Sequence, residues 1–154
     1  EIKIYYQDTD SMHIEEQDIE PLSDAFTKKY NRELIGKNMG QFHSDFSLDG
    51  ASDVYATKSI FLGKKSYIDE LKGVSKTGEI ITGYHIRMKG IPNACIEYTA
   101  EKLNLNNPFE LYQQLLEGKK ISFDLTQDGK KDFFEFTKDY KVMTKNEFMR
   151  DVVF

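Results

Sequence analysis

The N-terminal segment of the chain places two carboxylates two residues apart, between strand-like stretches. Residues 5–11 read Tyr-Tyr-Gln-Asp-Thr-Asp-Ser, so that Asp8 and Asp10 lie on either side of Thr9. Apolar residues recur on both sides of this run, which predicts a β-hairpin with an acidic turn. Because a hairpin tip is rigid and accessible, it can direct both carboxylates at one point. Carboxylate oxygens held in this way suit Mg²⁺, which also keeps waters and substrate phosphate oxygens as ligands.

An acidic pair of this spacing occurs in three settings. Enzymes that transfer phosphoryl groups use carboxylates to hold two metal ions about 4 Å apart. Glycosyltransferases use an Asp-x-Asp pair to hold a complex of metal and nucleotide. Many surface turns carry the same pair in solvent and bind nothing. The spacing alone leaves all three interpretations open.

The full string around the pair is more specific than the pair itself. Residues 6–11, Tyr-Gln-Asp-Thr-Asp-Ser, resemble the Tyr-x-Asp-Thr-Asp-Ser signature of family B DNA polymerases. Residues 62–67, Leu-Gly-Lys-Lys-Ser-Tyr, resemble the Lys-Lys-x-Tyr motif of the same family, and the two motifs stand in the family's order. Residues 85–92 are similar to the segment that leads from palm to thumb in the protein-primed branch, which has viral, organellar and linear-plasmid members.

The resemblance implies an α+β fold, in which an antiparallel palm β-sheet portion with a packed helix is followed by a small α+β thumb. Residues 1–92 would form the C-terminal half of the palm, and residues 93–154 the thumb. Since the chain begins inside the predicted hairpin, we expect it to be a fragment of a longer polymerase. An exonuclease domain, the first palm carboxylate motif and the fingers would then precede it.

The resemblance also implies roles in template-directed transfer of nucleotides from dNTPs to a primer end. Asp10 would coordinate two Mg²⁺ ions, or Mn²⁺ in their place, and Asp8 would support it; these two are the catalytic and metal-binding candidates. Tyr6 and Thr9 would lie near the nucleotide and the primer terminus. For Thr9 we also expect a hydrogen bond within the turn. For Tyr6 packing in a core is an equally open interpretation.

The second motif supplies the first candidates for DNA contact. Lys65 and Tyr67 lie two residues apart in a strand region predicted over 53–71, and so would share one face of it. By resemblance they would hold the primer strand near its end. Lys64 would point the other way, to a phosphate or to solvent. A half-buried tyrosine beside a solvated lysine is the alternative.

Two more basic residues, Arg87 and Lys89, would share a face near the end of a strand predicted over 79–88. They could contact backbone phosphates, which position a duplex without reading its sequence; a solvated strand face is equally open. The chain has a net charge of −5, which is not typical of a nucleic-acid binder. Residues 57–90, however, carry seven basic and three acidic side chains, so they form a basic segment of +4 in an acidic chain.

Composition sets the remaining expectations. Apolar residues are 39% and charged residues 31% of the chain, and no long apolar run predicts a membrane span. The one cysteine, Cys95, excludes an internal disulfide and is expected to be buried on a helix.

We expect an intracellular protein at a site of DNA replication, in the cytoplasm, an organelle or a virus-infected cell. Its partners would be primer–template DNA, dNTPs and, as a candidate, a terminal protein primer.

Periodicity and turn residues predict the other elements. Helices are expected over 24–34 with Ser23 as the cap, from a cap at Asn93 to about Leu103, and over 109–117 after Asn107 and Pro108. A strand is expected over 41–46, and residues 58–71 and 79–89 are expected to pair as a hairpin. Near the C-terminal end, strands are expected over 120–125, 133–136 and 140–143, with a turn at 128–129 after the first of them. The tail aromatics are expected to form a small core rather than to stack on bases: Phe123, Phe133, Phe134, Phe136, Tyr140 and Phe148. His13, His43 and His85 have no ligand spacing and are expected to be structural.

Two other functions remain as alternatives. The first is a non-catalytic module derived from a polymerase, which binds DNA or protein without chemistry. The second is a nucleotide-sugar transferase that uses Asp8 and Asp10, although this gives no reason for the Lys-Lys-x-Tyr match. Only the polymerase interpretation predicts salt-sensitive binding of a primer–template duplex.

Overall fold

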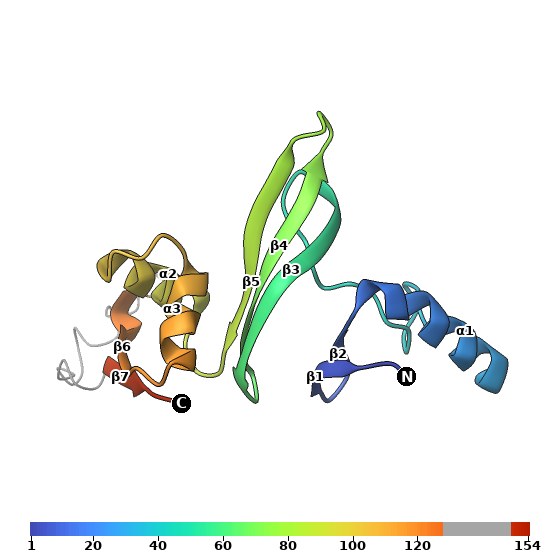
Figure 1. Ribbon diagram of the computed structural model, residues 1–154, viewed down its shortest axis with the longest axis horizontal. Helices are drawn as coiled ribbons and strands as arrows, with labels where there is room; N and C mark the ends of the chain where they lie inside the picture. The colour runs from blue at the N-terminus through green and yellow to red at the C-terminus, as the bar shows by residue number, and fades with distance from the viewer. Residues whose placement is uncertain (128–148) are drawn as a thin grey trace, which may run out of the picture. The chain divides into compact units, whose positions relative to one another are not determined.

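The computed structural model describes residues 1–127 and 149–154, and its fold is α+β with antiparallel sheets, as predicted (Figure 1). The helices are η1 (Glu16–Asp18), α1 (Ile19–Tyr30), α2 (Asn93–Lys102), α3 (Pro108–Leu116) and η2 (Leu125–Gln127). The strands are β1 (Ile4–Asp8), β2 (Ser11–Ile14), β3 (Ala51–Gly63), β4 (Ser66–Ser75), β5 (Ile80–Met88), β6 (Ile121–Asp124) and β7 (Met149–Val152). Residues 1–47 and 48–154 form two compact units, which are taken in turn.

The first unit opens with the predicted hairpin, because β1 and β2 pair antiparallel. The helix predicted over 24–34 is wrong in its bounds, since α1 covers Ile19–Tyr30. Pro21 lies in the first turn of α1. A proline is tolerated there because the first helical N–H groups have no partner within the helix. The helix ends at Asn31, whose φ of 53° is left-handed.

The strand predicted over 41–46 is also wrong. Ile35 and Phe42 form only an isolated parallel bridge, with Phe42 N–H donating to the Leu34 carbonyl at 2.8 Å. Alternation over six residues is a weak signal, and here the segment meets no second strand with which to continue a ladder.

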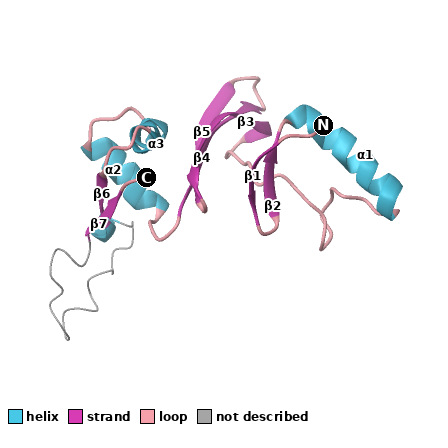
Figure 2. Cartoon of the chain, turned by 60° about the horizontal axis from the view of Figure 1, so that its bottom comes forward, coloured by secondary structure: helices cyan, strands magenta, loops and turns pink. Residues whose placement is uncertain are grey.

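The second unit contains a three-stranded antiparallel sheet in the order β3-β4-β5 (Figure 2). The single strand region predicted over 53–71 is wrong, since the chain reverses at Lys64 and Lys65 and makes two paired strands of it. Lys65 has a φ of 58° in this turn. The predicted pairing of the next two segments is confirmed, because β4 and β5 pair without a break from Ser66 opposite Met88 to Val74 opposite Ile80.

One face of this sheet forms the core together with α2 and α3, which lie beside β5 in Figure 1. Ile60, Ile68 and Ile86 make a row across the three strands and are all buried. Cys95 on α2 is fully buried in the same core, as predicted. The boundary that we expected after residue 92 therefore falls inside one packed unit. The assignment of the two parts to palm and thumb stays a prediction.

The C-terminal part begins with α3, for which Asn107 and Pro108 give the predicted start. The Asn107 side chain accepts a hydrogen bond from the Glu110 N–H at 3.1 Å. β6 and β7 then pair antiparallel, and Phe123 of β6 is fully buried, as expected for a core aromatic. The predicted turn at 128–129, the strands over 133–136 and 140–143, and the five aromatic residues beyond Phe123 lie outside the described residues.

The α3 cap makes a first stability prediction. Replacing Asn107 by Ala removes the acceptor for the Glu110 N–H, and the unit is expected to lose about 1 kcal/mol of unfolding free energy. Asn107→Asp keeps an acceptor at the cap and is the matched control, expected to lie within a few tenths of a kcal/mol of the parent protein. Urea denaturation followed by circular dichroism measures both. Equal stability of Asn107→Ala and Asn107→Asp would contradict a capping role.

Among the helices of the described residues, none has both the length and the apolar character needed to cross a membrane.

Candidate functional site

The acidic tip, which we define as Asp8, Thr9 and Asp10, lies at the end of the β1–β2 hairpin. Asp8 pairs with Ser11 as the last residues of the ladder, and Thr9 and Asp10 form the turn. The Ser11 hydroxyl donates to the Asp8 carbonyl at 3.1 Å. The Thr9 hydroxyl donates to the Asp8 carboxylate at 3.1 Å, which confirms the hydrogen bond expected within the turn. The sequence therefore folds locally into a tip in which Thr9 orients the first carboxylate and Ser11 holds the backbone.

The backbone of the tip is strained at Thr9. Its φ is 43°, in the left-handed region that a β-branched residue seldom adopts. Such a conformation costs of order 1–3 kcal/mol and occurs where surrounding structure imposes it, often at ligand sites. Glycine or asparagine would relax this turn, and the presence of threonine therefore supports a functional constraint on the tip.

The two carboxylates differ in exposure. Asp8 is half-buried and Asp10 is exposed. Hard oxygen donors on one rigid turn fit a divalent cation such as Mg²⁺, and the exposed one can approach an ion without moving the strand. Within residues 1–127 and 149–154, no three His, Cys, Asp or Glu side chains gather closely enough to hold a metal. Asp8 and Asp10 are the two carboxylates that the tip itself offers to a cation.

The two tyrosines before the tip differ in exposure. Tyr5 is exposed, and its hydroxyl donates to Glu15 at 2.8 Å, a bond that raises the pKa of Tyr5. Tyr6 is half-buried on the side of Asp8 and packs edge-on against His13, with ring centroids 5.6 Å apart. His13 also lies 5.8 Å from the Phe46 ring. Tyr6 therefore packs in a small aromatic group, and a role at the primer terminus stays a prediction.

The basic turn, which we define as Lys64 and Lys65, lies between β3 and β4 in the second unit. The prediction that Lys65 and Tyr67 share a strand face is wrong, because Lys65 belongs to the turn and only Tyr67 to the strand. Apolar residues resume directly after the turn, at Tyr67 and Ile68, and for this reason the pattern did not reveal the reversal. Lys64 and Lys65 are both exposed.

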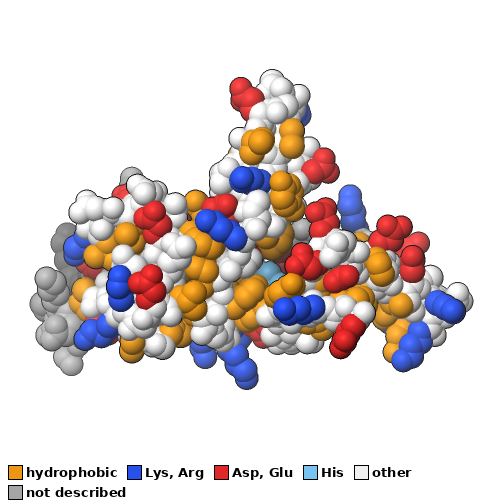
Figure 3. Space-filling model, viewed as in Figure 1, with side chains coloured by type: hydrophobic (Ala, Val, Ile, Leu, Met, Phe, Trp, Pro, Cys, Tyr) orange, Lys and Arg blue, Asp and Glu red, His pale blue; other side chains and the backbone are white. Residues whose placement is uncertain are grey.

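The end of β5 brings the other two basic candidates to this turn. The Lys89 N–H donates to the Lys65 carbonyl at 2.9 Å, and Arg87 lies directly opposite Tyr67 in the ladder. Arg87 and Lys89 are exposed. The structure thus gathers the four predicted basic residues at one end of the sheet, and Figure 3 shows Lys and Arg side chains there, at the lower end of the sheet.

Tyr67 itself is buried, with 9% of its surface exposed. Its ring lies 6.1 Å from the Phe61 ring and 5.7 Å from the His85 ring, measured between centroids. Since the ring is enclosed, it offers no face on which a base could stack.

Two further residues support this end of the sheet and carry no local sequence signal. The Tyr112 hydroxyl of α3 donates to the Arg87 carbonyl at 2.6 Å, and burial raises the pKa of Tyr112 far above its usual value, so that it remains a donor. Arg150 of β7 lies against the turn after β5, because a β-carbon at Gly90 would be 3.0 Å from its guanidinium. Arg150 is exposed and adds a fifth basic side chain. Both depend on contacts between distant parts of the chain.

A polar row lies across the sheet and was not predicted. It consists of Ser59, Asp69 and His85, which are paired directly across β3, β4 and β5. The Ser59 hydroxyl donates to one Asp69 oxygen at 2.5 Å, and His85 Nδ1 lies 3.0 Å from the other. Asp69 is fully buried, and the His85 side chain is 14% exposed. Serine contacts the aspartate and not the histidine, so the row is not a nucleophile triad.

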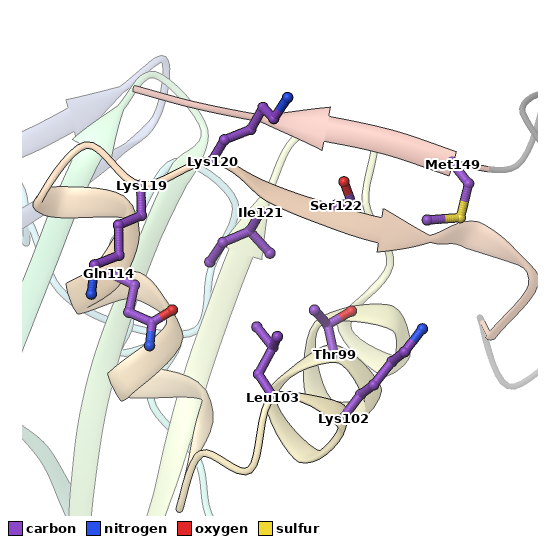
Figure 4. A pocket seen from close by; sticks show the side chains of 9 residues that line it. All are labelled: Thr99, Lys102, Leu103, Gln114, Lys119, Lys120, Ile121, Ser122 and Met149. Carbon is purple, nitrogen blue, oxygen red and sulfur yellow. The ribbon is translucent and has the colours of Figure 1, made fainter.

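A separate hollow of about 540 Å³ lies among α2, α3, β6 and β7 (Figure 4). Its lining contains Lys102, Lys119 and Lys120 beside apolar side chains. Two of these lysines have acidic neighbours: Lys119 lies 3.3 Å from Glu117, and Lys120 lies 3.8 Å from Asp151. The hollow is therefore less basic than the number of its lysines suggests.

Comparison of the chain with family models, with curated proteins and with solved structures finds no match.

Proposed function

We propose that the chain is the palm and thumb part of a family B DNA polymerase of the protein-primed branch. The enzyme would extend a primer on a template with nucleotides from dNTPs. The observation that carries the proposal is the acidic tip, where a strained Thr9 holds a Tyr-x-Asp-Thr-Asp-Ser sequence in a tight turn with Asp10 exposed. The Lys-Lys-x-Tyr sequence supports it, since its two lysines also occupy a hairpin turn.

In this function the acidic tip holds the catalytic metals. Asp10 would bind both ions, Asp8 would support it, and the first palm motif, outside this chain, would supply a further carboxylate. Bound Mg²⁺ would neutralise the triphosphate and lower the pKa of the primer hydroxyl. The chain's own contribution is placement: the Thr9 hydroxyl holds the Asp8 carboxylate, and the Ser11 hydroxyl holds the backbone carbonyl of Asp8.

The basic end of the sheet would hold the primer–template duplex. Lys64, Lys65 and Lys89 are exposed there and can contact phosphates, while the Tyr67 hydroxyl would hold the primer strand. Residues 93–154 would grip the duplex further along. The negative charge of the whole chain does not oppose this, because the basic residues lie together.

The full chain is expected to bind a primer–template duplex with an affinity that falls steeply as salt rises. Each phosphate contact contributes about −0.9 to the slope of log K against log salt, so Lys64→Ala and Lys89→Ala should each reduce the slope by about one. Lys76→Ala is the matched control, since Lys76 is an exposed lysine in the turn at the opposite end of β4. Fluorescence anisotropy over a KCl series measures all of these.

The alternatives predict other outcomes of the same titration. Binding of a nucleotide-sugar without binding of the duplex would favour a transferase. Duplex binding that is lost equally in the three lysine variants would show that the sheet end is not the contact.

A further inference from the structure

The polar row of Ser59, Asp69 and His85 stands next to Tyr67 on the same face of the sheet. Tyr67 and Asp69 are two residues apart on β4, and Arg87 and His85 are two apart on β5. Phe61, Tyr67 and Arg87 form the neighbouring cross-strand row. His85 is therefore a diagonal neighbour of Tyr67, and their ring centroids lie 5.7 Å apart with planes tilted by 42°.

The hydrogen bonds of the row fix the orientation of the His85 ring. Nδ1 lies 3.0 Å from one Asp69 oxygen, and the second oxygen accepts from Ser59 at 2.5 Å. Both oxygens of a fully buried carboxylate are thus engaged, which holds Asp69 in one rotamer. Rotation of the imidazole would break its bond to the carboxylate, so the ring presents one constant surface to Tyr67.

Stability alone does not account for a charged group at this position. Burying a carboxylate costs several kcal/mol, and apolar side chains of similar volume often give equal or greater stability. A buried carboxylate whose two oxygens are each held by a different side chain, in contrast, favours one geometry. The side chain whose geometry it specifies here is Tyr67, which is enclosed by His85 on one side and Phe61 on the other.

We propose that Ser59, Asp69 and His85 are positioning residues for Tyr67, and that they set the direction in which its hydroxyl meets the primer phosphate. The inference rests on the proposed function, in which Tyr67 holds the primer. The three residues touch no DNA themselves and act through the tyrosine ring.

A double-mutant cycle on duplex binding by the full chain tests the proposal. Tyr67→Phe removes only the hydroxyl and is expected to weaken binding about tenfold, the size of one hydrogen bond to a charged group. His85→Phe keeps a ring but loses the bond to Asp69, and should weaken binding about fivefold when Tyr67 is present. In the Tyr67→Phe background the same change should have no effect, because no hydroxyl remains to be positioned.

Matched controls separate positioning from general damage. Tyr84→Phe removes a hydroxyl from β5 on the core side of the sheet and should leave binding unchanged. If His85→Phe does not fold, as judged by circular dichroism, Ser59→Ala gives the same cycle while leaving the pair of Asp69 and His85 in place. A purely structural role would reduce binding equally in both Tyr67 backgrounds, and that result would overturn the proposal.

Duplex binding distinguishes failure of the positioning role from failure of the proposed function. Salt-sensitive duplex binding with no coupling between His85 and Tyr67 would reject the positioning role and leave the proposed function intact. Absence of duplex binding by the parent chain would reject both.

Discussion

Under the proposed function, Asp10→Asn is expected to abolish primer extension. Changing a residue that only supports a metal ligand costs roughly 10- to 100-fold, so loss of the ligand itself should cost more than about a hundredfold in kcat. Asparagine has nearly the same shape, and the exposed position in the turn accommodates it, so the tip should stay folded. Asp8→Asn should cost less, because in the proposed function Asp10 would hold the ions and Asp8 would support it. Single-nucleotide incorporation over a Mg²⁺ titration measures both.

Asp24→Asn is the matched control, since Asp24 is an exposed aspartate of α1 in the same unit as the tip. It should extend primers at the parent rate. Under the proposed function, the 154-residue chain by itself should bind duplex yet extend no primer, because that reaction also needs a first palm carboxylate and fingers. Normal extension by Asp10→Asn would remove the tip from the mechanism and leave the non-catalytic binding module as the better interpretation.

The acidic hairpin could be predicted because its signals are local. Apolar residues alternate on both sides of a short polar turn, and the ladder that ends at Asp8 and Ser11 follows from them. The start of α3 could be predicted for the same reason, since Asn107 and Pro108 satisfy the first turn without help from distant residues. Neither the strain at Thr9 nor the exposure of Asp10 was visible in the pattern, because both depend on backbone angles.

The hairpin of β3 and β4 could not be predicted from local signals. The turn at Lys64 and Lys65 has no residue with a strong turn preference at its centre, and a lysine takes the left-handed conformation instead. Strand-forming residues stand on both sides of it, and Gly63, directly before it, indicates a bend or close backbone approach within one long strand region. Missing the turn also hid the register, and only the register places Asp69 between Ser59 and His85, which lie 10 and 16 residues away in the sequence.

Asp69→Ala is expected to produce the largest loss of stability, about 3 kcal/mol of unfolding free energy for the second unit. Ser59 and His85 both lose their acceptor in a largely buried position, and the removed carboxylate leaves a cavity. Asp69→Asn is nearly isosteric and keeps an amide oxygen as acceptor, so it should cost only about 1–2 kcal/mol. Because the chain has two compact units, the unfolding has to be followed with a probe inside residues 48–154.

Replacing the whole polar row separates its effect on the unfolding free energy from its effect on the orientation of Tyr67. The combination of Ser59→Ala, Asp69→Leu and His85→Phe leaves no buried polar group without a partner, and its stability should return to within about 1 kcal/mol of the parent protein. Its duplex binding should nevertheless stay at the level of Tyr67→Phe, because no fixed imidazole then orients the tyrosine. Recovery of stability together with full recovery of binding would mean that the row only fills space. Recovery of stability alone would show that the charge was retained to specify the direction of a hydroxyl.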